Sequence, residues 1–552
     1  MLRSTSLRVL ALLVLATAPL GGCGVPSADG PADTYGIDFS LPEGSRTDGA
    51  IIFMVDGVSG EVFDSMLAAG ELPAIKKYMV DRGTYCPAAV ANTPSVTISN
   101  LASIATGQFP GHHGVVGVNW FDRNQLIWRN YDTIAQKNTL DGDYIAPTIY
   151  EQFPDRLTFS VFFQPHRGAT KFWENWTSAG PPFYFGWYEF VDRLTLWRLH
   201  ELAPIAREYR QFPAVTVVYL LAPDFRSYVH GTHSAEYRES LKHTDYQIGR
   251  VLGDLQRAGL LDKVHVALVS DHGHTQVTSH FDITKYMEKQ VGLKIARNQW
   301  WENAPFEDRL EDYRNAHGVL YGSGDRYWAV CLRRPIRADG KVVGYRDWLD
   351  RPTPADLQSY PTRDGNKDLL AEFVKDPAVD AIAYAAGEDV VRVRRADGEV
   401  EFRQPGGRGK DIAYRVIAGR DPLGYAGMIS ADAQAGTPLP QRQWLEQTSH
   451  TRYPDLPAQI LAYFRATRRA ADIAVFAAPA WDFRTVNKGG HGGLRPEDML
   501  VPLIVAGPGV PHRRINHART VDLVPTILSL LGKPLPPDLD GQPIVPPKNK
   551  KH

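Results

Sequence analysis

The strongest constraint on the fold is a set of short apolar runs, each long enough for one strand, separated by helical patterns. The runs are rich in β-branched residues at consecutive positions, which is typical of strands buried between two layers of helices. Strands that alternate with helices favour an α/β fold with a mostly parallel sheet flanked by helices. The strand-like runs are 51–55, 214–220, 264–269 and 503–506, and the helical patterns are 61–69, 234–258 and 520–531.

The length of 552 residues exceeds what one core supports, because a single core stops growing at roughly 250–300 residues. Residues 292–480 have a different pattern, with two alternating runs joined through Asp397-Gly398, a strong hairpin signal. The sequence therefore predicts an α/β domain in two parts, an α+β insertion or cap between them, and a polar tail. These cover 49–291 and 481–545, then 292–480, then 546–552.

The N-terminus has the layout of an export signal. Basic residues Arg3 and Arg8 precede an apolar run over 9–18, which is too short to span a bilayer comfortably. The run ends in Leu-Gly-Gly-Cys23, which resembles a bacterial lipobox and implies cleavage before Cys23 and lipidation of its sulfur; a plain signal peptide is the alternative. We expect a signal peptide over 1–23, a flexible Gly/Pro/Ser-rich tether over 24–48, and a lipid-anchored protein of the bacterial cell envelope, at the outer membrane or periplasmic face.

Charge and cysteine content exclude several classes of partner and site. Lys and Arg number 61 against 62 Asp and Glu, so no nucleic-acid-binding surface or polyanionic tail is indicated, and we expect membrane contact only through the lipid. Beyond Cys23, only Cys86 and Cys331 remain, too few for a cysteine metal cage. In an oxidising compartment these two could pair, or both could be buried free thiols.

Three of the strand-like runs are followed closely by an aspartate: Asp56, Asp224 and Asp271. In open α/β sheets, ligands bind outside the carboxyl ends of the strands, so three such side chains would converge on one edge. Carboxylates held this close repel one another unless a positive charge lies between them. The pattern therefore predicts a divalent metal site.

Histidines supply a second kind of ligand. His272 follows Asp271 directly, and His491 lies among four glycines that allow the backbone to fold tightly around it. His230 and His233 follow Asp224 within what we interpret as one loop. Mixed Asp and His ligation suits zinc, whereas an all-oxygen set would favour magnesium or calcium.

A hydroxyl-rich segment, 93–107, is the candidate source of a nucleophile. It could begin a helix, whose N-terminal N–H groups would face an anion. A hydroxyl next to a bound metal loses its proton more easily and becomes a competent nucleophile. Taken alone, the segment is equally compatible with a capped helix that carries spare hydroxyls.

Together these residues resemble the alkaline phosphatase superfamily, and within it the type I phosphodiesterase/nucleotide pyrophosphatase family. The resemblance covers roughly 50–280 and 491–545. Where that family has Thr-Phe-Pro-Asn followed by Val-Thr-Gly, this chain has TISN at 97–100 followed by ATG at 105–107. The resemblance implies an alkaline-phosphatase-like fold, with Thr97 as nucleophile and Asn100 as the side chain that steadies a phosphate oxygen.

The resemblance also implies two zinc ions and their ligands. One ion would be held by Asp56, Thr97, Asp271 and His272; the other by Asp224, His491 and a histidine from the segment after Asp224. In the family this histidine usually lies four residues after its aspartate, but here that position is Tyr228. We predict that His230 takes the role, with His233 as the alternative.

The sequence therefore predicts a metal-dependent hydrolase of phosphate esters, similar to phosphodiesterases and nucleotide pyrophosphatases, that acts on a small-molecule phosphate ester. A phosphomonoesterase of the same superfamily is an alternative, since metals and nucleophile do not separate the two. A non-catalytic envelope binding protein that retains the fold is a third, and the Tyr228 departure gives it weight. Zinc content and relative rates on monoesters and diesters distinguish the three.

Overall fold

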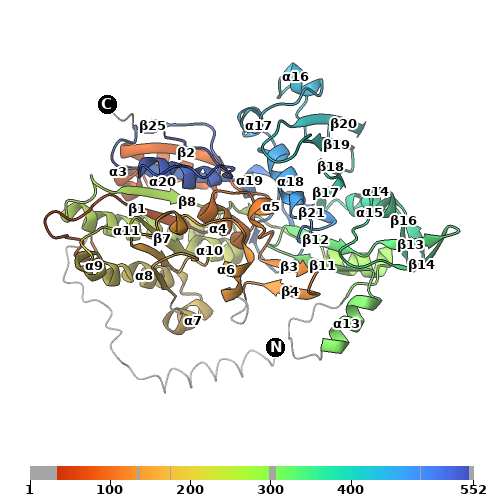
Figure 1. The fold of residues 1–552 in the computed structure, drawn as a ribbon, viewed down its shortest axis with the longest axis horizontal. Helices are drawn as coiled ribbons and strands as arrows, with labels where there is room; N and C mark the ends of the chain where they lie inside the picture. Colours follow the sequence, from red (N-terminus) through yellow and green to blue (C-terminus); the bar gives the residue numbers. More distant parts are fainter. Residues whose placement is uncertain (1–33, 133–136, 175, 297–305, 485, 546–552) are drawn as a thin grey trace.

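The computed structural model describes residues 34–132, 137–174, 176–296, 306–484 and 486–545. Two large sheets lie side by side, one in the α/β part of the chain and one in the region between its two parts (Figure 1). The predicted signal peptide, the start of the tether, Cys23 and the tail 546–552 lie outside the described residues. Among the described residues, no helix is both long and apolar enough to cross a membrane.

The first sheet has eight strands, and its central strands are the apolar runs of the sequence. Neighbouring strands are parallel except β24, which is antiparallel to both β2 and β8. This mixed α/β sheet flanked by helices confirms the predicted fold class. In spatial order the strands are β25 (Arg513–Arg514), β2 (Gly83–Val90), β24 (Leu500–Ala506), β8 (His265–Val269), β1 (Ala50–Val55), β7 (Val215–Leu220), β5 (Thr158–Val161) and β6 (Lys171–Trp173).

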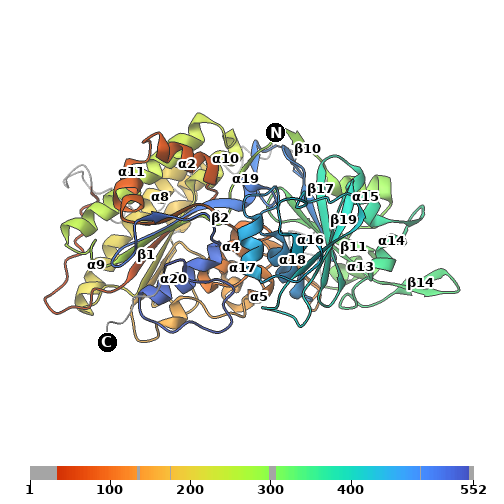
Figure 2. The same ribbon diagram turned by 90° about the horizontal axis from the view of Figure 1, so that it is seen from above.

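Helices cover both faces of this sheet (Figure 2). Strand β1 shows why: Ile51, Phe53 and Val55 pack in one apolar cluster with α2 (Gly60–Ala68) and α11 (Ala235–Arg257). The alternate residues Ala50, Ile52 and Met54 belong to a second cluster with α4 (Thr97–Thr106) and α20 (Leu523–Leu530). A strand buried on both faces needs apolar residues at every position, as the sequence has.

The second sheet is antiparallel throughout and falls within 292–480. The Asp-Gly hairpin lies in it as the turn between β18 and β19, where Arg395 pairs with Gly398. Its helices include α15 (Leu369–Lys375) in one apolar cluster and α18 (Leu456–Arg465) in the cluster that also contains α4, so the two sheets share a core. The strand order is β11 (Gly318–Gly322), β12 (Tyr327–Leu332), β21 (Ile473–Ala477), β17 (Val379–Gly387), β18 (Val390–Arg395), β19 (Gly398–Arg403) and β20 (Ala413–Gly419).

Shorter elements connect and cover the two sheets. The other helices are α3 (Pro73–Tyr78), α5 (Pro110–His113), α6 (Leu140–Asp143), α7 (Trp176–Tyr184), α8 (Tyr188–Trp197), α9 (Leu199–Glu208), α10 (Ala222–His230), α12 (Ile283–Tyr286), α13 (Phe306–Asn315), α14 (Pro354–Gln358), α16 (Ala431–Gln434), α17 (Gln441–Thr448) and α19 (Pro496–Met499). Two-stranded pairs are formed by β3 (Asn119–Asp122) with β4 (Ile127–Asn130), β9 (Thr275–Gln276) with β23 (Gly489–Gly490), β10 (Ser279–His280) with β22 (Trp481–Asp482), β13 (Pro335–Ala338) with β14 (Lys341–Tyr345), and β15 (Tyr360–Thr362) with β16 (Gly365–Lys367).

The segment 34–48 packs on the domain, although the sequence predicts that it belongs to a flexible tether. Tyr35, Ile37 and Phe39 are buried against the apolar cluster that contains α11. The Asp254 carboxylate on α11 accepts hydrogen bonds from the backbone N–H groups of Tyr35 and Ile37, at 3.0 and 3.1 Å. The alternating apolar residues of this short stretch give it a face that packs, and the ordered part therefore begins before Ala50.

The two cysteines of the described domain are both free and buried. Cys86 lies on β2 of the first sheet and Cys331 on β12 of the second. Of the two alternatives left open by the sequence, the structure has the buried thiols, and burial raises the pKa of the Cys86 thiol to about 12.

Candidate metal centre

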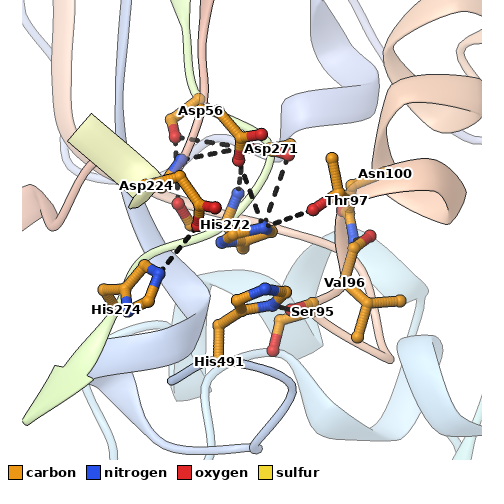
Figure 3. A network of polar contacts seen from close by, with 12 residues as sticks. Asp56, Ser95, Val96, Thr97, Asn100, Asp224, Asp271, His272, His274 and His491 are labelled. Atoms are coloured by element: carbon orange, nitrogen blue, oxygen red, sulfur yellow. Dashed lines mark hydrogen bonds and ion pairs between the residues drawn. The ribbon is translucent and has the colours of Figure 1, made fainter. Parts of the chain in front are cut away.

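The three aspartates meet at one edge of the first sheet (Figure 3). Strands β8, β1 and β7 are parallel neighbours, so their carboxyl ends lie side by side. Asp56 follows β1, Asp271 follows β8 by two residues, and Asp224 lies in the first turn of α10, just after β7. All three carboxylates are buried. The parallel register thus brings together side chains that are up to 215 positions apart.

Gly57 allows the β1 and β7 ends to approach this closely. Its φ of +66° lies in the left-handed region, and a Cβ at this position would lie 2.7 Å from the Asp224 Cα. Its N–H donates to Asp271 Oδ1 at 3.2 Å, and the next N–H, of Val58, donates to Ser270 Oγ at 2.9 Å. This turn therefore connects all three carboxylate segments.

Replacing Gly57 by alanine should lower the free energy of unfolding by about 2–5 kcal/mol, because the methyl group combines backbone strain with a clash against Asp224. The matched control is Gly70→Ala. Gly70 has a similar φ of +75°, but a Cβ there meets nothing within 4 Å, so only strain of about 1–2 kcal/mol remains. Denaturant unfolding of the two variants measures the difference, and equal losses would mean that the close approach is unimportant.

His272 directs one nitrogen into the carboxylate cluster. Its Nδ1 donates to the Gly273 carbonyl at 3.0 Å, so Nε2 carries the free lone pair. Nε2 lies 3.1 Å from Thr97 Oγ1 and 3.4 Å from both Asp56 Oδ1 and Asp271 Oδ2. An imidazole lone pair facing two carboxylate oxygens is unfavourable unless a cation lies among them.

His491 is oriented in the same way from the other part of the chain. Its Nδ1 donates to the Ser95 carbonyl at 2.8 Å, which leaves Nε2 free. Its ring stacks on that of His272, with centroids 3.5 Å apart and planes at 10°. Gly492, at φ +114°, provides the backbone turn that the flanking glycines predicted.

The described part of the chain contains two groups of three potential ligands, and within each group the ligand atoms all lie within 4.8 Å of one another. One consists of Asp56, Asp224 and His272, and the other of Asp224, His274 and His491. His274 was not among the ligands predicted from the sequence, although it lies two residues after His272. His274 Nε2 is 2.7 Å from Asp224 Oδ1 (Figure 3).

His230 and His233, proposed from the sequence to complete the second set, do not join it. His230 lies at the last turn of α10 with a side chain 30% exposed, and its Nδ1 is 3.6 Å from Glu236. His233 is exposed. The segment was predicted to be a loop, whereas in the structure it is a helix, which directs His230 away from Asp224.

The electrostatics of the cluster fit a bound cation. Burial, together with neighbouring carboxylates, raises the pKa of Asp56, Asp224 and Asp271 well above their usual range. Asp56 Oδ1 and Asp271 Oδ2 are buried without a hydrogen-bond partner among the described residues, while the other Asp56 oxygen accepts from the Tyr219 hydroxyl. Burial also lowers the pKa of His272 and His491, so both rings are neutral and can act as ligands.

Thr97 and Asn100 belong to the first turn of α4, which begins at Thr97. The Thr97 hydroxyl faces the cluster, as its contact with His272 shows (Figure 3). The Asn100 side chain is fully buried: its amide donates to the carbonyls of Asn92, Pro94 and Val96, and its oxygen accepts from the Asn92 N–H. Asn100 therefore holds the loop that presents Thr97, which differs from the phosphate contact expected for it.

Sequence comparison places the chain among known proteins. Residues 50–325, half of the chain, match the family model described as type I phosphodiesterase/nucleotide pyrophosphatase. Similar proteins include ectonucleotide pyrophosphatase/phosphodiesterase family member 1 of Rattus norvegicus (26% identical, covering 44% of this chain and 26% of that protein). Member 3 of Bos taurus is 24% identical (45% and 27%), and venom phosphodiesterase 2 of Crotalus adamanteus is 25% identical (45% and 29%). The matched segment spans less than a third of these relatives.

Proposed function

Because the chain belongs to the type I phosphodiesterase/nucleotide pyrophosphatase family, we propose that it hydrolyses phosphate esters, with phosphodiesters and nucleotide pyrophosphates as the preferred substrates. Thr97 is the nucleophile in this proposal, and two divalent cations, both zinc, are its cofactors. The names of its relatives include nucleotide pyrophosphatases and venom phosphodiesterases, which supports the substrate class.

One observation carries the proposal: a hydroxyl at a helix N-terminus lies in contact with the buried Asp and His cluster. Thr97 Oγ1 is 3.1 Å from His272 Nε2, and the first turn of α4 has N–H groups without intrahelical partners. A phosphate group next to Thr97 would therefore meet both a nucleophile and hydrogen-bond donors for its oxygens. A protein that only binds phosphate would need the donors without the nucleophile, and a helix start with a purely structural role would need neither.

The residues present fit two cations. The first would be held by Asp56, Asp271 and His272 with the Thr97 oxygen, and the second by a set that includes Asp224 and His491. Neutral imidazoles and carboxylates are the donor types that zinc takes. When bound, such cations lower the pKa of an adjacent hydroxyl and balance the charge that develops on phosphoryl oxygens.

The chemistry assigned to the chain itself is a two-step displacement. Thr97 Oγ1 forms a bond to phosphorus while the bond from phosphorus to the departing ester oxygen breaks, which gives a phosphothreonine. Water then attacks the same phosphorus, Thr97 leaves, and one water is consumed in total. The stacked His272 and His491 rings hold each other in place beside the cluster, and Asn100 fixes the loop from which Thr97 attacks.

Comparison of a diester with a monoester of the same leaving group tests the proposal. We expect the zinc-loaded protein to hydrolyse bis(p-nitrophenyl) phosphate with a kcat/KM at least about tenfold above that for p-nitrophenyl phosphate, a difference of about 1.4 kcal/mol in the barrier. A reversed preference would favour the phosphomonoesterase alternative. A protein that holds zinc but hydrolyses neither compound would favour the binding-protein alternative.

We also propose that the protein is exported and held in the bacterial cell envelope by a lipid on Cys23. The basic, apolar and small-residue layout of residues 1–23 supports this. The mass of the mature N-terminal peptide tests it: cleavage before residue 23 with an acylated cysteine is expected, and an intact precursor would contradict it.

A further inference from the structure

The helix that carries Asp224 determines which later residue can accompany it. Asp224 lies in the first turn of α10 (Ala222–His230), and residues four apart on a helix lie on the same face. The residue four positions after Asp224 is Tyr228. His230, six residues after Asp224, is rotated by about 240° around the axis, and the helix ends at Gly231 before His233 is reached. No histidine of this segment therefore stands over Asp224.

Tyr228 instead packs against two imidazoles. Its ring meets that of His274 edge-on, with centroids 4.9 Å apart and planes at 89°, and that of His491 at 5.6 Å and 63°. The helix position that faces the second ligand group is thus filled by an aromatic ring, and the imidazole in contact with Asp224 comes from a different segment.

A two-residue ladder positions that imidazole. Strands β9 and β23 are antiparallel, with Gly489 opposite Gln276 and Gly490 opposite Thr275. One step further along the same register, His491 stands opposite His274. The ladder also packs against α10, because a Cβ on Gly489 would lie 2.5 Å from the Ser227 carbonyl oxygen. Three segments, α10, β9 and β23, therefore meet with Asp224, His274 and His491 at their junction.

The contacts of His274 are those of a ligand. Its side chain is buried, its Nε2 lies 2.7 Å from Asp224 Oδ1, and its ring centroid is 5.3 Å from that of His491. Its Nδ1 is buried without a hydrogen-bond partner among the described residues, so this nitrogen can carry the ring proton and leave the Nε2 lone pair to bind a cation. Together with Asp224 and His491 it offers ligand atoms that all lie within 4.8 Å of one another.

We propose that His274 is the third protein ligand of the second cation, with Asp224 and His491, and that it replaces a histidine four residues after Asp224. Tyr228, at the vacated position, shields the two imidazoles from solvent. This assignment rests on the proposed two-cation function, but its tests measure metal binding and need no hydrolysis. Metal binding without turnover would therefore refute the function and leave the ligand assignment standing.

Metal content gives the first test. The wild-type protein should hold about two zinc ions per chain, and His274→Ala should hold about one after dialysis at equal free zinc. His230→Ala is the matched control, since its side chain is partly exposed and outside the group, and it should keep both. Two ions retained in His274→Ala, or one lost in His230→Ala, would overturn the assignment.

A matched pair of substitutions distinguishes the loss of a metal ligand from a failure of the variant protein to fold. His274→Cys supplies a thiolate, which divalent metals bind, and His274→Ser has nearly the same size without comparable affinity. With cobalt in place of zinc, only His274→Cys should gain a near-ultraviolet thiolate-to-cobalt charge-transfer band. The wild type serves as the blank because Cys86 and Cys331 are buried and belong to neither ligand group. A cobalt-loaded His274→Cys protein that lacks the band would overturn the proposal.

A separate experiment tests whether a histidine at position 228 can take over the role proposed for His274. The double substitution Tyr228→His/His274→Ala returns a histidine to the face of α10 that carries Asp224. We expect it to regain the zinc ion that His274→Ala loses. If the double variant stays at one ion per chain, the two positions are not interchangeable and that part of the proposal is wrong.

Discussion

Replacing Thr97 by alanine should lower the turnover of a chromogenic phosphodiester by on the order of 10⁴-fold or more. The hydroxyl supplies the attacking oxygen in the proposed displacement, and the only remaining route would be direct attack by water at a phosphate that the site still binds. Because Thr97 opens α4 but contributes no side-chain cap to it, the substitution should cost little stability. Initial rates at saturating substrate measure the effect.

Thr97→Ser is the control for this experiment. It keeps an oxygen at the same distance from His272 and loses only a methyl group, so we expect activity within about 10–100-fold of the wild type. Both variants should keep about two metal ions per chain, since the carboxylates and imidazoles remain. Full activity in Thr97→Ala would remove Thr97 from the mechanism and leave the metal cluster without an assigned nucleophile.

Removal of the metal ions should abolish hydrolysis and also destabilise the fold, increasingly so as the pH rises. Each ion present at about 1,000 times its dissociation constant stabilises the folded state by about 4 kcal/mol. Without ions, three buried carboxylates face one another, and their folded-state pKa values are raised well above 3.8. The folded chain then binds more protons than the unfolded chain, so the free energy of unfolding falls as the pH rises from about 4 towards those raised values.

The histidines of the cluster act in the opposite direction but over a different pH range. Their folded-state pKa values are lowered below 6.5, so they destabilise the folded chain only as the pH falls below about 6.5. Above pH 6.5 their contribution changes little, because an unfolded imidazole is already half deprotonated there, whereas carboxylates with pKa values raised well above 3.8 continue to lose protons. Metal-free protein should therefore have a lower melting temperature at pH 8 than at pH 6.5.

Thermal unfolding with and without zinc at the two pH values measures this effect. The metal-loaded protein should show a much smaller difference, because the cations neutralise the carboxylates at both pH values. Buried acids bonded outside the cluster, such as Asp245, which accepts from the Ala74 and Ile75 N–H groups and whose pKa is raised to about 6, contribute equally to both forms and cancel in the comparison. A metal-free protein as stable at pH 8 as the loaded one would contradict the presence of a cation site.

The sequence predicts the strands of the α/β part well because each is an uninterrupted apolar run, such as residues 51–55. It does not predict the direction of β24, since a run of apolar residues has the same pattern in either orientation. Strand β2 was not recognised because Pro87 interrupts it, and the pairing with β24 shifts register there. The hairpin between β18 and β19 was recognised because its turn has a specific chemical signature, Asp397-Gly398.

The site residues also divide into those that the sequence predicts and those that it does not. Asp56, Asp224, Asp271 and His272 could be placed from the sequence because strand ends define their positions. His274 could not, because its proximity to His491 depends on a two-residue ladder between segments more than 200 positions apart. Periodicity could have excluded His230: once Ala222–His230 is treated as a helix, Tyr228 shares a face with Asp224 and His230 does not. The packing role of Asn100 depends on the fold of residues 92–96, which no local pattern determines.

The antiparallel strand β24 has a consequence for synthesis of the chain. It occupies an interior place in the first sheet, between β2 and β8, yet it is made more than 200 residues after them. At translation rates of about 5–20 residues per second, the gap between those strands stays open for some tens of seconds. During that time two strand edges are exposed to aggregation or to binding by chaperones. A nascent chain released before residue 491 would thus lack the strand that joins the two halves of the sheet, as well as His491.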